Sequence, residues 1–469
     1  MSRVDTAWLR MDNDVNLMMI VGVWLLQPAI AYATLCECVD ARLRPYARFH
    51  RKVLQDAAGA SWVDDDSFDI HHHVVREKLQ RKPGQSERAA LQQRAGELAN
   101  TPLAADRPLW QFHLVERYDG GSALIARVHH CIGDGIALIS VMLSLTDGGA
   151  EPPLRPRRGA AARAGGDGLG DAVMRPFADL PAKALAIYDA GLEKSIALLA
   201  NPQQGLLGAL DKARSAYRVL GDVAAMALMP DDSPTRLKGK PGGTKLVAWS
   251  EPLPLDRVKT IGKGLGCSIN DVLLGCVTGA IGQYLRGAGD DPSGQEIRAM
   301  VPVNLRPPGE AWRLGNRFGL APLVLPIGIL NPIERVFAVR ARMNALKTSY
   351  QPLLAFAVLA VAGLMVKPVQ DMILGLFAKK ATAVMTNVPG PAAPLTFCGS
   401  TLRQTMFWVP ASGDIGVGVS ILSYGGGVQF GLIVDEALCP DPQAVIDRFE
   451  PEFEQLLTLT LMLPWGEER

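Results

Sequence analysis

Hydrophobic and polar residues recur with two different periods along the chain, and together these periods predict a mixed α/β protein. Period-two alternation and short apolar runs predict strands at 17–26, 49–54, 110–115, 122–128, 244–250, 298–303, 319–326, 383–387, 405–409, 416–424 and 428–434. Helical spacing predicts helices at 35–43, 86–99, 136–143, 255–263, 272–285 and 442–463. Strands and helices thus follow one another over most of the sequence, as in α/β sandwiches with mixed sheets.

A change of composition divides the chain into two α/β portions. Residues 150–170 are rich in Pro, Arg, Gly and Ala without an apolar period, which predicts a flexible linker. Residues 171–230 carry two long helical patterns that are interrupted near Asn201-Pro202. We therefore predict a first domain at 1–170, a helical connection at 171–230 and a second domain at 231–469.

Composition narrows the class of protein further. With 469 residues and 48% hydrophobic residues, the chain can build a large core. The 48 basic and 47 acidic residues nearly cancel, which argues against nucleic acid as the main partner. The seven cysteines form no CxxC pair, and Cys36 and Cys38 are too close to bridge each other. These features favour a reducing cytosol, and the polar start of the chain shows no secretory signal.

The longest apolar segment runs from 353 to 377 and is interrupted by Lys367-Pro368. Neither half reaches the roughly 20 residues that a membrane span requires. Two interpretations stay open: a buried helix pair, or a helix at a membrane surface or along an acyl tunnel. A cytoplasmic protein bound peripherally at the inner membrane face or at lipid inclusions is the expectation.

The strongest candidate for chemistry is the string His129-His130-Cys131-Ile132-Gly133-Asp134-Gly135. It stands between a predicted strand and a predicted helix, where glycines permit a tight turn. A neutral imidazole is a suitable base near neutral pH. Because neighbouring side chains on an extended backbone point to opposite sides, we expect one histidine to face a substrate and the other the fold.

These residues also permit other interpretations. The histidines could form a structural pair with Asp134 as the helix cap. A zinc site is disfavoured, because adjacent histidines diverge and no further ligand stands at helical spacing. His71-His72-His73 also resembles a metal motif, but a mixture of exposed and core side chains is favoured. Cys131 is not needed as a nucleophile if a histidine acts as base.

Four further motifs occur in a fixed order along the chain: Pro108-Leu109-Trp110, Asn270-Asp271, Asn304-Leu305-Arg306-Pro307 followed by Gly315-Asn316, and Thr386-Asn387-Val388-Pro389-Gly390-Pro391. Together with HHxxxDG they resemble the bacterial wax ester synthase/acyl-CoA:diacylglycerol acyltransferase family over nearly the full length. Thr386 replaces the family's serine and keeps its hydroxyl. The resemblance implies two chloramphenicol-acetyltransferase-like α/β sandwich domains that face each other.

The resemblance also implies roles for the residues of the first motif. His130 would be the general base, and His129 would orient the loop. Asp134 would point away from the substrate and pair with a buried arginine, for which Arg306 is the candidate. Gly135 would leave room for the thioester.

The remaining motifs supply the other candidate residues. Asn270 is the candidate oxyanion donor, with a second helix-cap group beside Ser268 as the alternative. Substrate contacts are assigned to Trp110, Asn387, Pro389 and Gly390, although Trp110 also fits a core position and the Pro-Gly-Pro segment also fits a loop-shaping role. Structural support is assigned to Arg306, Asp271 and Pro108. No metal is expected.

The implied reaction is direct acyl transfer from acyl-CoA to a long-chain alcohol, giving a wax ester, and to diacylglycerol, giving triacylglycerol. Acyl-CoA is then a substrate, and no cofactor is expected. Two alternatives share features of the sequence: a condensation-type enzyme that uses carrier-bound acyl groups, and a non-catalytic lipid-binding protein. A serine lipase is disfavoured, because residues 418–422 do not complete a G-x-S-x-G elbow.

Overall fold

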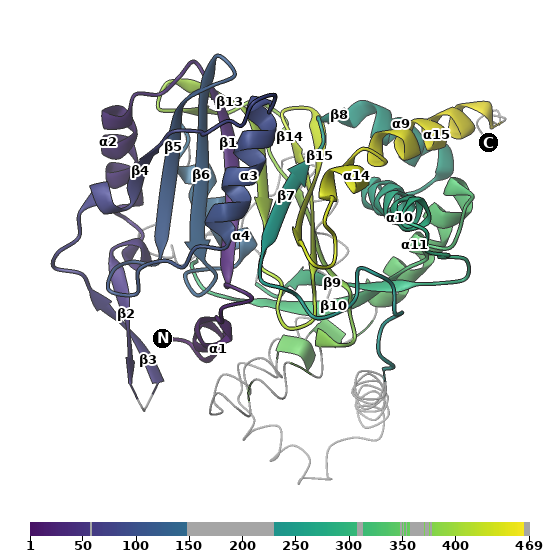
Figure 1. Cartoon of the computed structure of the whole chain (residues 1–469), viewed down its shortest axis with the longest axis horizontal. Coiled ribbons are helices and arrows are strands. Elements are labelled where there is room, and N and C mark those ends of the chain that lie inside the picture. Colours follow the sequence, from purple (N-terminus) through teal and green to yellow (C-terminus); the bar gives the residue numbers. More distant parts are fainter. Residues whose placement is uncertain are drawn as a thin grey trace, which may run out of the picture.

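The computed structural model describes residues 1–56, 59–147, 229–306, 313–347 and 378–463, with isolated positions between 349 and 375. The predicted helical connection at 171–230 lies almost entirely outside these residues, as does most of the apolar segment 353–377. The described residues form two mixed sheets that lie next to each other, each covered by helices (Figure 1). The predicted mixed α/β fold is thus confirmed.

The first sheet has six strands in the order β12-β13-β1-β6-β5-β4. Only β4 and β5 are parallel. Its strands are β1 (Met19–Gln27), β4 (Val74–Glu77), β5 (Trp110–Tyr118), β6 (Gly121–His129), β12 (Thr396–Phe397) and β13 (Ser400–Trp408). Asp119 and Gly120, both with positive φ, form the tight turn of the β5–β6 hairpin.

Side chains that alternate along β1 and β6 build two separate cores on the two faces of this sheet. Trp24, Leu124 and Val128 pack with helices α2 (Tyr32–Leu43) and α4 (Gly135–Ser144) on one face. Val23 and Ile125 pack with α3 (Glu87–Ala99) on the other face. Short 3-10 turns at Ala47–Phe49 and Ile70–His72 and the hairpin β2 (Arg51–Asp56)–β3 (Gly59–Asp64) complete this half.

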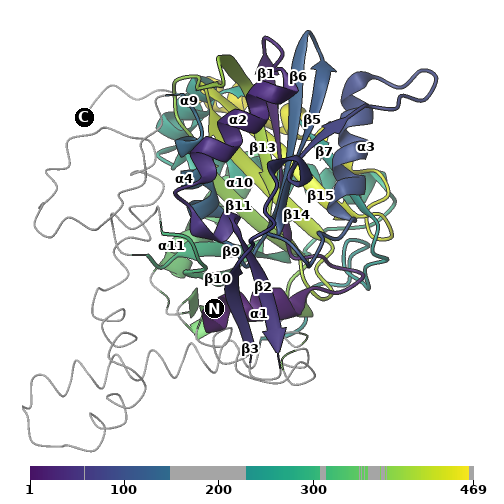
Figure 2. The same ribbon diagram turned by 90° about the vertical axis from the view of Figure 1, so that its left-hand side faces the viewer.

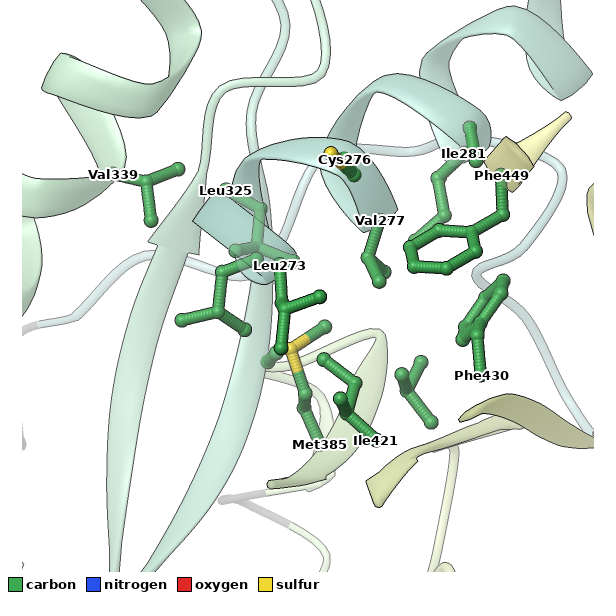
Figure 3. Packing of buried hydrophobic residues seen from close by; sticks show 14 of the residues in the cluster. Leu273, Cys276, Val277, Ile281, Leu325, Val339, Met385, Ile421, Phe430 and Phe449 are labelled. Carbon is green, nitrogen blue, oxygen red and sulfur yellow. The ribbon is translucent and has the colours of Figure 1, made fainter. Parts of the chain in front are cut away.

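The second sheet follows the order β10-β9-β11-β14-β15-β7, with β8 paired to β15. Its strands are β7 (Lys245–Trp249), β8 (Leu253–Pro254), β9 (Ile297–Asn304), β10 (Phe318–Leu325), β11 (Ala383–Pro389), β14 (Val417–Tyr424) and β15 (Gly427–Asp435). Its helices are α9 (Leu255–Leu265), α10 (Ile269–Gly287), α11 (Pro332–Lys347), α14 (Pro442–Ile446) and α15 (Phe449–Met462). Figure 3 shows how α10 residues such as Val277 pack against Phe430 of β15 and Phe449 of α15.

The two sheets do not divide the chain at one point. Strand β13 comes from the C-terminal portion but pairs antiparallel with β1, where Val21 lies opposite Trp408. In Figure 1 the late-sequence β13 accordingly lies among the early-sequence strands. The N-terminal portion also contacts the second sheet, because the Asn100 side chain, which follows α3, donates to the carbonyl of Lys245 in β7 at 3.3 Å. A boundary drawn in the sequence therefore does not separate the two structural halves.

Two elements differ from the prediction. Helix α1 (Arg3–Met11) was not expected, and Figure 2 shows it near the N-terminus beneath the sheets. The closing helix predicted at 442–463 is two helices, because Asp447 and Arg448 stand between α14 and α15. A long apolar period alone cannot reveal such a break, since both helices bury the same face.

Two features concern the cysteines and the membrane. Cys38 of α2 forms a disulfide with Cys398, 360 positions later, so the absence of a CxxC pair did not exclude a bridge. Within the described residues, no single helix has both the length and the apolar character of a membrane span. The pair α9 and α10 meets that test jointly by length and composition, but it is bent by 101°.

Candidate active site

The HHxxxDG string lies where the sequence places it, in a turn between a strand and a helix. Strand β6 ends at His129, and α4 begins at Gly135. The backbone N–H of His130 donates to the carbonyl of Met18 at 2.7 Å, which ties the turn to the start of β1. Both histidine side chains are buried, with exposed fractions of 3% and 2%. Water therefore has little access to either ring in this structure.

His130 lies in an aromatic environment. Its ring stacks on Trp8 of α1 with a centroid distance of 4.0 Å and an interplanar angle of 13°. Phe318 of β10 lies on it at 5.6 Å. Burial lowers the pKa of His130 to about 4, because the charged imidazolium loses its solvation. The ring is therefore neutral at neutral pH and can accept a proton.

His129 is engaged by the fold. Its Nδ1 accepts the backbone N–H of Cys131 at 3.1 Å, and its Nε2 lies 3.3 Å from the Asp12 carboxylate. Burial opposes a charged ring, but the neighbouring Cys131 and Asp12 outweigh it and raise the pKa of His129. The pKa values of the two adjacent histidines are thus shifted in opposite directions, and the two rings have different partners. Neighbouring side chains can differ in this way because they point to opposite sides of an extended backbone.

Asp134 carries both structural contacts that the sequence suggested. It accepts the backbone N–H of Ala137 at 3.0 Å and so caps α4. It also forms an ion pair with Arg306, whose Nη1 lies 2.6 Å from Oδ2. Arg306 further donates to the carbonyl of Gly315 at 2.5 Å, and the Arg317 N–H donates to Asp134 at 2.9 Å. The turn of the first half is thereby joined to the β9–β10 connection of the second.

A second network holds the same turn through its main chain. The Asn316 side chain donates to the carbonyl of His130 at 2.8 Å and to Asp5 of α1 at 2.8 Å. Arg48 pairs with Asp5 at 3.0 Å and donates to the carbonyl of Ile132 at 2.8 Å. Because these residues come from four distant parts of the chain, the turn is fixed only when both halves are folded.

Sequence reasoning missed Trp8, Asp5 and Arg48. Asn316 belonged to a recognised motif, but it was not assigned to the site. Asp5 lies in the polar start of the chain, where no motif marks it. The available signal was the amphipathic spacing of 3–11 behind Ser2, which caps α1 by accepting the Asp5 N–H at 3.1 Å.

An apolar cavity of about 100 Å³ begins beside the motif at Gly135. It is lined by α4 and by strands β1, β6 and β13 of the first sheet, and by residues 390–395 and strand β14 of the C-terminal portion. The side chains that line it include Trp24, Leu138, Ile139, Met142, Leu143, Leu395, Leu402 and Phe407. Gly390 also lines it and is close-packed, because a Cβ there would lie 2.5 Å from the Ser423 carbonyl. Pro389 immediately precedes it as the last residue of β11.

A second, more polar cavity of about 190 Å³ lies against His129 and Asp12. The other residues that line it include Gln55, Leu103 and Leu109. Val128 lines the first cavity and His129 the second, and these neighbours face opposite sides of β6. The motif therefore has a cavity on each side of the strand that carries it.

Asn270 and Asn387 are brought together by the structure. The Asn387 amide donates to Oδ1 of Asn270 at 2.6 Å. The cap of α10 is formed by Ser268 and Asp271, whose side chains each bind the other's backbone N–H. The second cap group beside Ser268 is therefore Asp271 and not Asn270, for which this role was the alternative. Neither asparagine lines the two cavities.

Trp110 occupies a core position, which was the alternative interpretation to a substrate contact. Its side chain is fully buried, and its indole N–H donates to the carbonyl of Phe49 at 2.8 Å. It stacks on His73 at 4.5 Å and lines neither cavity. One face of β5 must be buried against the helices, and Trp110 lies on that face. Pro108 supports the start of β5, since its carbonyl accepts the Trp110 N–H at 2.9 Å.

No metal centre is present among the described residues, where no three His, Cys, Asp or Glu side chains are grouped to hold an ion. The three consecutive histidines follow the favoured interpretation. His71 and His72 are exposed, whereas His73 is buried.

Comparison with known proteins agrees with this geometry. Residues 1–273 match the wax ester synthase/diacylglycerol acyltransferase catalytic domain, and residues 314–457 match the WS/DGAT C-terminal domain. A probable diacylglycerol O-acyltransferase of Mycobacterium tuberculosis (strain ATCC 25618 / H37Rv), tgs1, is 25% identical over 98% of this chain and 96% of its own length. The chain also resembles tgs2 of the same strain, with 26% identity over 96% and 97% of the two proteins.

Solved structures share the fold. The wax ester synthase/diacylglycerol acyltransferase from Marinobacter aquaeolei VT8 superposes with a TM-score of 0.66 at 20% identity, covering 98% of this chain and 100% of that one. The first condensation domain of the CDA synthetase superposes with a TM-score of 0.57 at 17% identity, covering 98% and 95%. Fold and motif together define an acyltransferase. The chain belongs to the wax ester synthase/diacylglycerol acyltransferase family.

Proposed function

We propose that this acyltransferase moves a long-chain acyl group from acyl-CoA to a long-chain alcohol and to diacylglycerol, with His130 as the general base. The observation that carries the proposal is the buried imidazole of His130 in a turn that is followed by Gly135 at the wall of an apolar cavity. The products would be wax esters and triacylglycerol. The proposal includes a cytoplasmic enzyme that works peripherally at the inner membrane face or at lipid inclusions, where such products collect.

The reaction needs one group that accepts and then returns a proton. His130 takes the proton of the acceptor hydroxyl as its oxygen attacks the thioester carbonyl carbon. The tetrahedral intermediate then collapses, the C–O bond remains, and the C–S bond breaks. His130 returns its proton to the departing CoA thiolate. Because acceptor and donor react directly, Cys131 is not required, and its side chain is fully buried.

The cavities suit the two kinds of substrate group. The apolar walls of the cavity at Gly135 suit a segment of a hydrocarbon chain, since burial of each methylene contributes about 0.8 kcal/mol. Gly135 itself leaves space, because a Cβ there would meet only a Phe407 ring carbon at 4.0 Å. The more polar cavity on the opposite side of β6 offers a separate approach for the second substrate.

Asn270 is the proposed donor to the oxyanion of the tetrahedral intermediate. Its Oδ1 accepts the Asn387 amide, which orients the side chain so that its own NH₂ group is directed away from Asn387. An amide can donate to the developing charge without changing its own protonation state. Asn387 then acts on the reaction by orienting Asn270.

The test replaces His130 by alanine and follows release of free CoA thiol with palmitoyl-CoA and hexadecanol, or with diacylglycerol. We expect turnover to fall by about 10²–10⁴-fold, the usual contribution of a positioned base. The exposed His72→Ala is the matched control and should keep full activity. Thermal unfolding followed by circular dichroism verifies that both variants fold. Unchanged esterification by folded His130→Ala protein would exclude the proposed mechanism.

A condensation-type reaction with carrier-bound acyl groups is the second candidate, because the fold also superposes on a condensation domain. Offering the same acyl chain on CoA and on a carrier protein separates the two. Faster transfer from the carrier protein would favour this second candidate. The hypothesis of a non-catalytic lipid-binding protein is set aside, because the chain belongs to an acyltransferase family.

A further inference from the structure

Helix α1 places an aromatic ring directly on the proposed base. The Trp8 indole and the His130 imidazole are nearly parallel, with centroids 4.0 Å apart. Trp8 itself is only 6% exposed and packs beside Phe318, whose ring lies 5.8 Å away. One face of the imidazole is therefore covered by a residue that lies more than one hundred positions earlier in the sequence.

We infer that Trp8 is a positioning residue for acyl transfer: its indole face fixes the plane of the His130 ring and keeps water from that face. The inference rests on the proposed role of His130 as the base. Stacking restricts rotation of the imidazole about its side-chain bonds, so the reacting nitrogen keeps one direction. Holding a catalytic group in its reactive geometry is a recognised part of rate enhancement.

The position of Trp8 is set by α1 and not by His130. Asp5, one turn earlier in the helix, is fully buried and is held by Arg48 and Asn316. The carbonyl of Ala7 accepts a hydrogen bond from Gln370 at 3.0 Å. The Trp8 indole N–H is buried without a hydrogen-bond partner in the described part of the chain. Packing and stacking therefore place this ring.

The indole is packed by apolar neighbours that come from both halves of the molecule. Val4, Met11, Met18, Leu305 and Phe318 belong to the same buried cluster as Trp8. Such a surrounding favours one ring position, because close-packed side chains have few alternative rotamers. The imidazole plane is thus fixed by a rigid surface.

The charged groups around His130 influence its pKa less than burial does. Asp134, at the start of α4, favours a protonated His130, but Arg306 neutralises it. His129 on β6 disfavours a second positive charge nearby. Asp5 on α1 is paired with Arg48. Burial is the largest influence and lowers the pKa of His130 to about 4, and Trp8 supplies part of that burial.

Removal of the indole should therefore change the pH dependence in a defined direction. Water that reaches the ring stabilises the imidazolium and raises the pKa of His130 toward its ordinary value of about 6.5. The base must be unprotonated to act, so the acidic limb of the pH–rate profile should move to higher pH. Activity is expressed per folded molecule at each pH, so that acid unfolding of a destabilised variant does not move this limb.

The experiment compares Trp8→Phe, Trp8→Leu and Trp8→Ala. Trp8→Phe keeps an aromatic face and should retain kcat within about threefold and an unshifted acidic limb. Trp8→Ala should lower kcat by about tenfold or more, with KM for acyl-CoA within about twofold, and move the acidic limb up by roughly one pH unit. Val339→Ala, a fully buried residue of α11 outside this cluster, is the control for lost core packing and should lower only the melting temperature.

A second measurement does not depend on activity. Titration of ¹³C-labelled histidine by NMR gives the pKa of His130, whose signal is assigned by its absence in His130→Ala. We expect this pKa to rise in Trp8→Ala and to stay unchanged in Trp8→Phe. If Trp8→Ala does not fold, Trp8→Leu takes its place, since leucine keeps apolar volume but provides no ring.

The outcomes separate this inference from the proposed function. An inactive His130→Ala with unshifted Trp8→Ala and Trp8→Leu profiles would overturn the role of Trp8 and leave the base intact. An active His130→Ala would overturn the base. In that case the NMR titration still decides whether Trp8 controls the ring, and an unchanged pKa rejects that control. Trp8→Leu indistinguishable from Trp8→Phe in pH profile and kcat would also overturn the stacking role.

Discussion

Two buried arginine–carboxylate pairs lie in different parts of this molecule and have different structural roles. Asp134 and Arg306 join the histidine turn to the β9–β10 connection, with side chains 4% and 1% exposed. Arg335 and Glu452 join α11 to α15 inside the second half, and each side chain is 3% exposed. Burial and chemistry are thus nearly the same, while only the first pair touches the turn that carries His130.

The comparison shows how one kind of interaction serves two purposes. Arg335 also donates to the carbonyl of Gly275 in α10 at 2.9 Å, and Gln283 of that helix donates to Glu452 at 2.5 Å. The pair therefore holds three helices together. Breaking a buried pair leaves an uncompensated charge, so both pairs should matter strongly for stability. Activity measured per folded molecule should separate them.

The largest effect is expected for Arg306→Met, which leaves Asp134 buried without its ion-pair partner. We expect the free energy of unfolding to fall by about 3–5 kcal/mol. We also expect kcat of the folded fraction to fall by at least about tenfold, because the turn that presents His130 loses its link to the second half. Urea unfolding and the thiol-release assay measure the two quantities.

Arg306→Lys is the matched variant for this pair. It keeps the charge but loses the planar, two-pronged donor, so both effects should be intermediate. If Arg306→Met were destabilised but kept full kcat, the pair would be structural in the same sense as Arg335 and Glu452. The distinction between the two pairs would then disappear.

Arg335→Met breaks the second pair, which does not contact the histidine turn. Its free energy of unfolding should also fall by about 3–5 kcal/mol, since burial raises the pKa of Glu452 and the carboxylate loses the cation that offsets it. Its kcat per folded molecule should remain within about twofold of the wild-type value. A loss of kcat comparable to that of Arg306→Met would show that helix packing in the second half controls the site.

The sequence predicts the first of these two pairs and the turn that it holds, but not the second pair. The apolar run before His129, the glycines after it and the apolar period from 136 predict the strand, turn and helix that the structure contains. The resemblance predicts the pairing of Asp134 with Arg306, because the two residues belong to two motifs of one family. Arg335 and Glu452 belong to no recognised motif, so the sequence did not predict their ion pair.

Other features lie beyond local pattern. The sequence predicts a strand at β13. Its pairing with β1 depends on a crossover of the C-terminal portion into the first sheet, which local pattern does not predict. Trp8 lies next to His130 only because α1 packs at the junction of the halves. The partner of Cys38 is 360 residues away. Periodicity predicts elements and their buried faces, whereas contacts between distant elements depend on the whole fold.

Glu77 is a third carboxylate with cationic partners, and it is less deeply buried than Asp134 or Glu452. Glu77 of β4 lies 2.8 Å from both Arg94 of α3 and His113 of β5. Burial alone would raise the pKa of Glu77, but the hydrogen bonds from His113 and Arg94 outweigh it and lower the pKa to about 2. The ionised group therefore stabilises the fold above its unfolded pKa of about 4.5, and that contribution is lost as the pH falls toward about 2.

Glu77→Gln should remove this pH-dependent contribution while leaving kcat unchanged. The difference in free energy of unfolding between wild type and Glu77→Gln should be largest near about pH 7 and should shrink between about pH 4.5 and about pH 2. Urea unfolding at several pH values measures it. Asp64→Asn, which breaks the exposed pair with Arg51, is the control and should change stability by less than about 1 kcal/mol. A pH-independent difference for Glu77→Gln would mean that Glu77 contributes through packing and not through its charge.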